Sequence, residues 1–180
     1  FLKREIAHLL RFYQDIVQHA KHDDYFALLS PKFSYKTGVM AQEVKEFIQN
    51  HSNQDVYLFN PYPMHAYAFQ NVWQQAKVHH PEILSLVDRL FNTVGMDFQT
   101  AATHRHHLHQ VVYCNYWVAK KSFFDQYIPF LVTLDQATEN MPAEQREEYF
   151  AMTNYKTQAC CYPFIFERLL TTYLWMHTNV

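Results

Sequence analysis

The strongest candidate for acid–base chemistry in this sequence is a glutamate next to an arginine inside an apolar segment. Glu167 and Arg168 interrupt "YPFIFERLLTTYL", whose remaining residues favour burial. A carboxylate in such surroundings is costly unless it is paired. Glu167 is therefore expected either to bond a nearby cation or to have a raised pKa and a chemical task.

A pair of lysines could bind phosphate. Lys32 and Lys36 flank two aromatic residues in "SPKFSYKTG", directly after an apolar run. Their ammonium groups, with Thr37 and the backbone at Gly38, could hold a diphosphate without a metal. Exposed lysines are common in loops, so a solvated loop is the alternative.

A third group has the residue types of a sugar site. Asn115, Tyr116 and Trp117 follow the apolar run "VVYC". Aromatic rings stack on the CH faces of sugars, and an amide bonds their hydroxyls. The equally weighted alternative is that Trp117 belongs to the core and Asn115 caps a turn.

The segment "HRHHLH" places four histidines close together, and imidazoles at this spacing could bind zinc or a similar metal. No cysteine or carboxylate stands at ligand spacing beside them, so an exposed loop is favoured. The three cysteines, Cys114, Cys160 and Cys161, are interpreted as reduced thiols without chemistry. The four histidines are His104, His106, His107 and His109.

The expected elements place the lysine pair at the edge of a sheet. Apolar runs at Tyr25–Leu29 and Asp55–Phe59 enclose the helical pattern "MAQEVKEFIQNH". Strand, helix and strand in this order, with both strands apolar throughout, predict a parallel βαβ unit covered on both faces. Ligands bind beyond the carboxyl ends of such strands, where Asn60 and the lysine loop would meet.

The remaining sequence predicts more helix than strand in one domain spanning residues 1–180. Helical patterns are expected at 4–20, 64–78, 81–94 with Gly95 just past the end, 116–137, 143–152 and 164–177, with a kink or a start at Pro129, an irregular segment at 97–109 and a third strand at 111–115.

Composition excludes several classes of function. The formal net charge is -2, which argues against the basic face that nucleic-acid binding needs. Only two glycines are present, which excludes a P-loop and a dinucleotide fingerprint. No apolar run is long enough to span a membrane, so a soluble, cytoplasmic protein is expected.

Four stretches in order, "DDYFALLSPKFSYKTG", "DVYLFNPYP", "VVYCNYWVAKKSFFDQYIPFL" and "YPFIFERLLTTYL", resemble bacterial glycosyltransferase-like proteins encoded with capsule and lipopolysaccharide genes. The resemblance runs from about residue 20 to the end. It implies the GT-A fold, an α/β, Rossmann-like, mostly parallel sheet flanked by helices. The family has more sequence before the first helix, so this helix-rich chain is expected to lack the first strand.

GT-A enzymes usually hold a divalent metal, Mn or Mg, on the donor diphosphate through an Asp-x-Asp motif. This sequence has Asp55 and Asn60 at the two ends of a strand and no such motif. The resemblance therefore makes Lys32 and Lys36 the substitute charge.

The predicted function is transfer of a sugar from a nucleotide-sugar donor to a glycan or lipid-linked glycan acceptor, with peripheral contact at the inner membrane. Glu167 is the expected base, with Asp97 in reserve. The alternatives are a non-catalytic binding or assembly module and a metal protein using the four histidines. The other expected site residues are Lys32, Lys36, Thr37, Asp55 and Asn60 for the donor, and Asn115, Tyr116, Trp117 and Arg168 for the sugar or acceptor.

Overall fold

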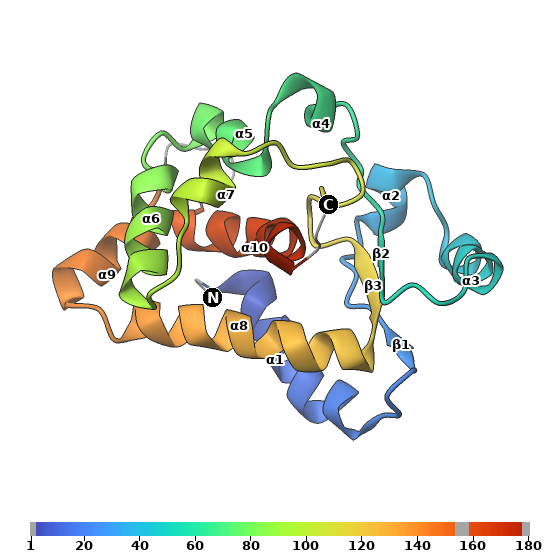
Figure 1. The fold of residues 1–180 in the computed structure, drawn as a ribbon. Helices are drawn as coiled ribbons and strands as arrows, with labels where there is room; N and C mark the ends of the chain where they lie inside the picture. Colours follow the sequence, from blue (N-terminus) through green and yellow to red (C-terminus); the bar gives the residue numbers. More distant parts are fainter. Residues whose placement is uncertain (1–2, 154–158, 178–180) are drawn as a thin grey trace.

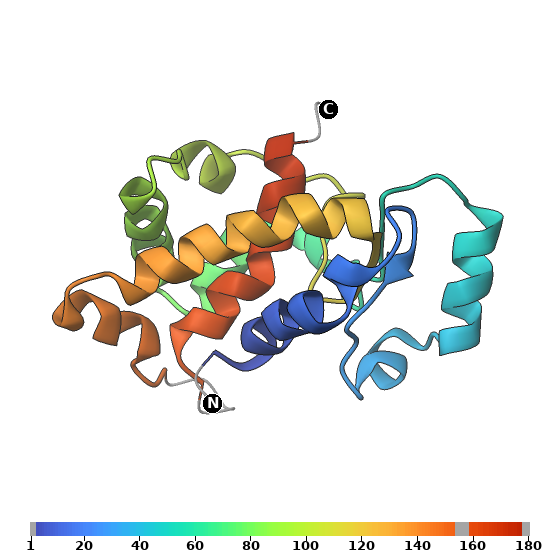
Figure 2. The ribbon, with the colours of Figure 1, turned by 90° about the horizontal axis from the view of Figure 1, so that it is seen from below.

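A computed structural model describes residues 3–153 and 159–177, and helices make up most of it (Figure 1). Helix α10 (Cys161–His177) lies at the centre of the helical body, and both views show other helices around it (Figures 1 and 2). It contacts α1, α5, α6, α7, α8 and α9. Nearly every side of α10 is apolar and buried, which is the pattern of a core helix.

The remaining helices are α1 (Arg4–Asp15), η1 (Val17–His19), α2 (Phe33–Thr37), α3 (Ala41–Asn50), α4 (His65–Ala68), α5 (Val72–His79), α6 (Ile83–Thr93), α7 (Gln99–Thr103), α8 (Lys121–Glu139) and α9 (Ala143–Phe150). Most of the remaining helices follow the predicted patterns in outline, but α2 forms in the lysine segment that was expected to be a loop and α7 in a segment that was expected to be irregular.

A small antiparallel sheet lies at one side of the helical body (Figure 1). Its strands are β1 (Tyr25–Phe26), β2 (Val56–Leu58) and β3 (Trp117–Lys120), in the order β1-β3-β2. Ala119 in the central strand stands opposite both Phe26 and Val56. The sheet therefore joins three segments that are far apart in the sequence.

The prediction of a GT-A-like, mostly parallel sheet is wrong. Strand β3 lies between β1 and β2 and runs antiparallel to both, so the two strands of the expected βαβ unit do not pair. Their outer residues are only half-buried, and α3 is exposed except at Val44 and the half-buried Ile48, so the described helices do not form a layer over both faces of the sheet. A short apolar run indicates burial, but it does not specify a strand's partner or direction.

Other boundaries also differ from prediction. The third strand begins at Trp117, after the expected segment 111–115, and the irregular segment 97–109 contains α7. The pattern at 64–78 is divided into α4 and α5, with the Asn71 side chain accepting from the backbone of Trp73 and Gln74 at the start of α5. Such an N-cap satisfies otherwise unpaired donors and fixes where a helix begins.

One helix end agrees closely with the sequence signals. Gly95 follows α6 with φ +71°, a left-handed conformation that glycine adopts without the usual steric cost. Pro129 does not begin a helix, because it lies inside α8, which continues on both sides of it. In the part of the chain that the structure describes, no helix combines the length and apolar character needed to cross a membrane.

Candidate functional site

A cavity of about 390 Å³ lies among α1, α8, α10, β3 and the segments 28–31 and 114–115. Side chains such as Ile6, Leu131 and Phe166 give it apolar walls, while Glu5, Asn115 and Glu167 supply polar groups. We call it the Glu167 cavity. Its volume lies in the lower part of the range of about 300–1,000 Å³ that is usual for ligand pockets.

Glu167 is positioned by the second turn of α10, where its neighbours on the helix face the core. It is half-buried, and its Oε1 accepts the backbone N–H of Cys114 at 2.9 Å. A carboxylate has about four lone-pair positions, so one N–H donor leaves capacity for a ligand hydroxyl or proton. The geometry suits either a general base or a hydroxyl acceptor.

The chain opposite Glu167 makes an unusual turn. Cys114 and Asn115 both have positive φ, +66° and +53°, which is uncommon for residues other than glycine. The Asn115 side chain donates from Nδ2 to Glu5 Oε2 at 3.0 Å. Strained backbone of this kind costs about 1–3 kcal/mol per residue and often occurs at ligand sites.

Lys36 reaches the outer side of this turn. Its Nζ donates to Cys114 Sγ at 3.1 Å and lies 5.9 Å from the ring centroids of both Tyr62 and Tyr116. Burial, followed by the charge of Glu167, raises the pKa of Cys114, although Lys36 opposes that rise. The sulfur therefore keeps its proton at neutral pH. Lys36 provides a cation that does not line the cavity but contacts Cys114, which does.

The other expected donor-binding residues make local contacts and do not line the cavity. Lys32 is exposed in the turn before α2, and Thr37 Oγ1 donates to Phe33 O at 2.8 Å. Asp55 pairs with Lys120 at 2.9 Å, and Asn60 Oδ1 accepts from the Tyr62 backbone at 2.9 Å. The segment that carries the two lysines does meet the segment that follows Asn60, but the contact is between Lys36 and Tyr62.

Asp97, the reserve base, is exposed at the start of α7. It accepts from the Thr100 hydroxyl and from the backbone N–H of Gln99, the latter at 2.9 Å. The hydrogen bond from the Thr100 side chain is the main cause of its lowered pKa. These contacts describe a helix cap, and Asp97 is not among the cavity residues.

The expected sugar-binding residues divide between the cavity and the core. Trp117 lines the cavity beside Asn115, although most of its ring packs against Phe124 and neighbouring aromatics. Tyr116 is buried, and its hydroxyl pairs with Ser30 Oγ at 2.9 Å. Tyr116 therefore contacts the cavity residue Ser30 and does not line the cavity itself.

Arg168 points away from the cavity toward α5. It is buried and donates to Val72 O, Phe164 O and Gln75 Oε1 at 3.2, 2.8 and 2.7 Å. Three neutral acceptors therefore satisfy a buried guanidinium, which identifies a packing role.

The four histidines of "HRHHLH" have different surroundings. His106 is buried near Trp175, whereas His104 is exposed and its Nδ1 donates to Thr100 O at 2.9 Å. His107 and His109 are exposed and stack on each other with ring centroids 5.5 Å apart. Among the described residues, these four do not form a group with converging ligand atoms.

Sequence reasoning missed one contact of the cavity and one group of side chains outside it. Glu5 bonds Asn115 across a separation of 110 residues, and no local pattern predicts such a contact. The second feature is a group formed by His80, Glu82 and Cys161, which lie close together in space. The spacing of His80 and Glu82 beside a proline was a usable signal, but the cysteine comes from a distant segment.

Comparisons with known proteins supply no further guide to the site. A scan against models of protein families finds no match, and searches of curated proteins and of solved structures find none either.

Proposed function

We propose that the Glu167 cavity binds a sugar unit and that the protein takes part in glycosyl transfer, with Glu167 as the base. One observation carries the proposal: Glu167, expected as the base, lines the same cavity as Asn115 and Trp117, expected as sugar-binding residues. An aromatic edge, an amide and carboxylates together suit a ligand that has both CH faces and hydroxyl groups.

The proposed reaction uses these groups as follows. The acceptor hydroxyl oxygen attacks the anomeric carbon, its proton passes to Glu167, and the bond to the leaving diphosphate breaks. The leaving group gains negative charge, and Lys36, whose Nζ donates to the cavity residue Cys114, is the proposed cation that stabilises it. A nucleotide-sugar donor, a surface-polysaccharide acceptor and a cytoplasmic position at the inner membrane belong to the same proposal.

A second candidate is a glycan-binding module that performs no transfer. Lys32, Thr37, Asp55 and Asn60 do not line the cavity, and the side chains of Thr37, Asp55 and Asn60 are bonded elsewhere, which favours this candidate. The module would bind a sugar in the same cavity, and Glu167 would then accept a hydroxyl without taking its proton.

Two measurements distinguish these candidates. Calorimetry with monosaccharides and with uridine, guanosine and thymidine diphosphate sugars measures binding, and release of the nucleoside diphosphate measures transfer to water or to added glycan. Glu167→Gln keeps an acceptor for the Cys114 N–H but cannot act as a base. We expect it to bind within a few-fold of the unmodified protein and to lose turnover by about 100-fold or more.

The control is Asp97→Asn, which removes an exposed carboxylate outside the cavity and should leave turnover unchanged. Sugar binding without diphosphate release would support the module. Absence of binding across both panels would contradict both candidates, and full turnover in Glu167→Gln would remove Glu167 as the base.

A further inference from the structure

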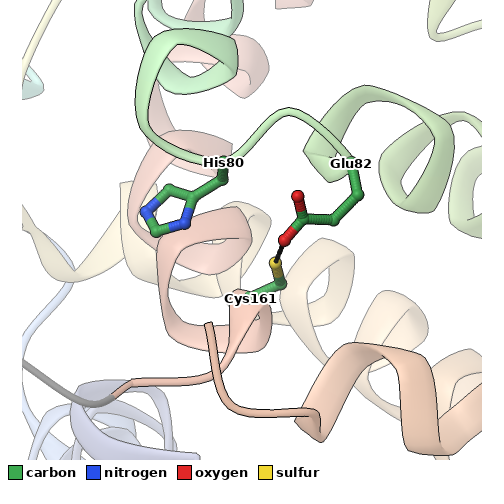
Figure 3. A group of neighbouring side chains, drawn as sticks. All are labelled: His80, Glu82 and Cys161. Atoms are coloured by element: carbon green, nitrogen blue, oxygen red, sulfur yellow. Dashed lines mark hydrogen bonds between the residues drawn. The ribbon is translucent and has the colours of Figure 1, made fainter. Parts of the chain in front are cut away.

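Three side chains whose types can bind a metal ion lie close together where three helix ends meet. They lie outside the Glu167 cavity. His80 directly follows α5, Glu82 directly precedes α6, and Cys161 is the first residue of α10. One ligand atom from each lies within 4.8 Å of the other two (Figure 3). Within residues 3–153 and 159–177, no other three His, Cys, Asp or Glu side chains gather in this way.

The backbone holds His80 and Glu82 in place. The His80 N–H donates to Ala76 O at 2.9 Å, and the His80 carbonyl accepts from Ile83 N at 3.0 Å. Pro81 stands between the two ligand residues, and its ring restricts the backbone there. The backbone positions of the two ligand residues are therefore fixed relative to each other before any ion binds.

Packing also fixes the imidazole. His80 is only 2% exposed, and its ring stacks on Phe164 with centroids 4.2 Å apart. Phe164 lies on the first turn of α10, as Cys161 does, so the same helix end positions two walls of the group.

Cys161 and Glu82 already stand at a distance suited to a shared cation. The Cys161 thiol donates to Glu82 Oε1, with 3.2 Å between sulfur and oxygen, and Figure 3 shows the His80 ring beside this contact. Bond lengths of about 2.0–2.3 Å and tetrahedral geometry place two ligand atoms about 3.5 Å apart on zinc. A cation could therefore replace the thiol proton with small side-chain movements.

We propose that His80, Glu82 and Cys161 form a binding site for a divalent transition metal ion, with zinc as the ion that the donor set favours. Imidazole nitrogen, carboxylate oxygen and thiolate sulfur are the three protein ligand types of zinc, whereas a thiolate disfavours calcium and magnesium. On binding, the ion bonds to the sulfur and the thiol proton leaves to solvent.

The charges and the exposure of the group define the kind of site. A carboxylate and a thiolate together balance a divalent ion, while the imidazole stays neutral. Glu82 is exposed, so the site opens to solvent on that side and leaves a fourth position for water. The ion would link the α5–α6 junction to the beginning of α10, the helix that carries Glu167.

Cobalt is the probe for the test, because Co²⁺ takes tetrahedral sites and gives a thiolate charge-transfer absorption. Protein without a histidine tag is titrated with Co²⁺, and Zn²⁺ is then added in competition. We expect one Co²⁺ per chain, a thiolate band that Zn²⁺ abolishes, and a rise in melting temperature with Zn²⁺ because the ion binds the folded state.

Three variants make the test specific. Cys161→Ser should abolish the thiolate band, and Glu82→Gln should weaken Co²⁺ binding at least ten-fold. Glu82 is exposed and glutamine can still accept from the thiol, so this variant should fold even where Cys161→Ser does not. The double variant His107→Ala, His109→Ala removes two exposed imidazoles elsewhere and should bind Co²⁺ as the unmodified protein does.

The absence of a thiolate band would overturn the proposal. It would also be overturned if Glu82→Gln bound Co²⁺ with unchanged affinity, or if the His107, His109 variant alone lost binding. The last outcome would assign the metal to the histidine segment.

Discussion

The Glu167 carboxylate and the Cys114 backbone N–H are joined by a 2.9 Å hydrogen bond. This contact ties α10 to a turn in which two consecutive non-glycine residues have positive φ. Glu167 therefore supports the wall of the cavity that it also lines, and its structural role has to be separated from any chemical one.

Replacement of Glu167 should separate these two roles. Glu167→Ala leaves the Cys114 N–H without its acceptor, and we expect the free energy of unfolding to fall by about 1–3 kcal/mol. Glu167→Gln keeps an acceptor and should lose less than half of that. Urea unfolding followed by circular dichroism measures both. Equal losses in the two variants would contradict a role for this hydrogen bond.

Asn115 should tolerate glycine better than alanine. Both substitutions remove the hydrogen bond to Glu5, but only alanine keeps the steric cost of positive φ, which is about 1–2 kcal/mol. We expect Asn115→Gly to unfold at nearly the same temperature as the unmodified protein. We expect Asn115→Ala to have a free energy of unfolding lower by about 1 kcal/mol. Thermal unfolding of the pair tests this. If alanine is as stable as glycine, the turn relaxes easily.

Arg168 should not be replaceable by lysine. Its guanidinium reaches three acceptors at once, and a lysine ammonium cannot reproduce that planar arrangement. Arg168→Lys is expected to lower the free energy of unfolding by about 2 kcal/mol or more. Arg146→Lys is the matched control, because Arg146 pairs with Glu139 at a half-exposed surface position. Similar losses in both variants would show that the buried contacts of Arg168 add little.

His106 should make stability depend on acidity. Burial lowers the pKa of His106 from its ordinary value of 6.5 to about 4. The unfolded chain therefore binds more protons between these values, so stability is complete above pH 6.5 and falls as the pH drops toward 4. The loss amounts to about 3 kcal/mol by linkage.

His106→Phe should flatten this acid limb, as measured by urea unfolding between pH 7 and pH 4. Burial also lowers the pKa of His65 and His80, so part of the slope should remain. His109→Phe, at an exposed position, is the control and should retain the full slope. An unchanged slope in His106→Phe would assign the pH dependence to other groups.

Prediction of the helices succeeded where the signals were local. The apolar spacing in "PEILSLVDRLFNTVG" and Gly95 after it predicted α6 almost to its ends. The Asp55–Phe59 run was also correctly assigned as a strand. Its partner was not predictable, because β3 reaches it from a distant segment and no residue near Val56 specifies that pairing.

The residues of the candidate cavity show the same difference between local and distant signals. Glu167 was singled out because a charged residue inside an apolar helix is conspicuous in sequence, and Asn115 and Trp117 were singled out from their chemistry. All three line the cavity, and their roles there stay predictions. Glu5 and Cys114 were not assigned to the site, since their roles depend on α1 and the 114–115 turn approaching α10.

Local properties of the chain, namely apolar spacing, caps and side-chain types, were enough to predict a helix-rich protein and the positions of most helices. The antiparallel order of the sheet, the direction of Arg168 away from the cavity and the proximity of His80, Glu82 and Cys161 were visible only in the folded chain. These features depend on contacts between distant segments, which form only when the whole chain buries its apolar surface around α10.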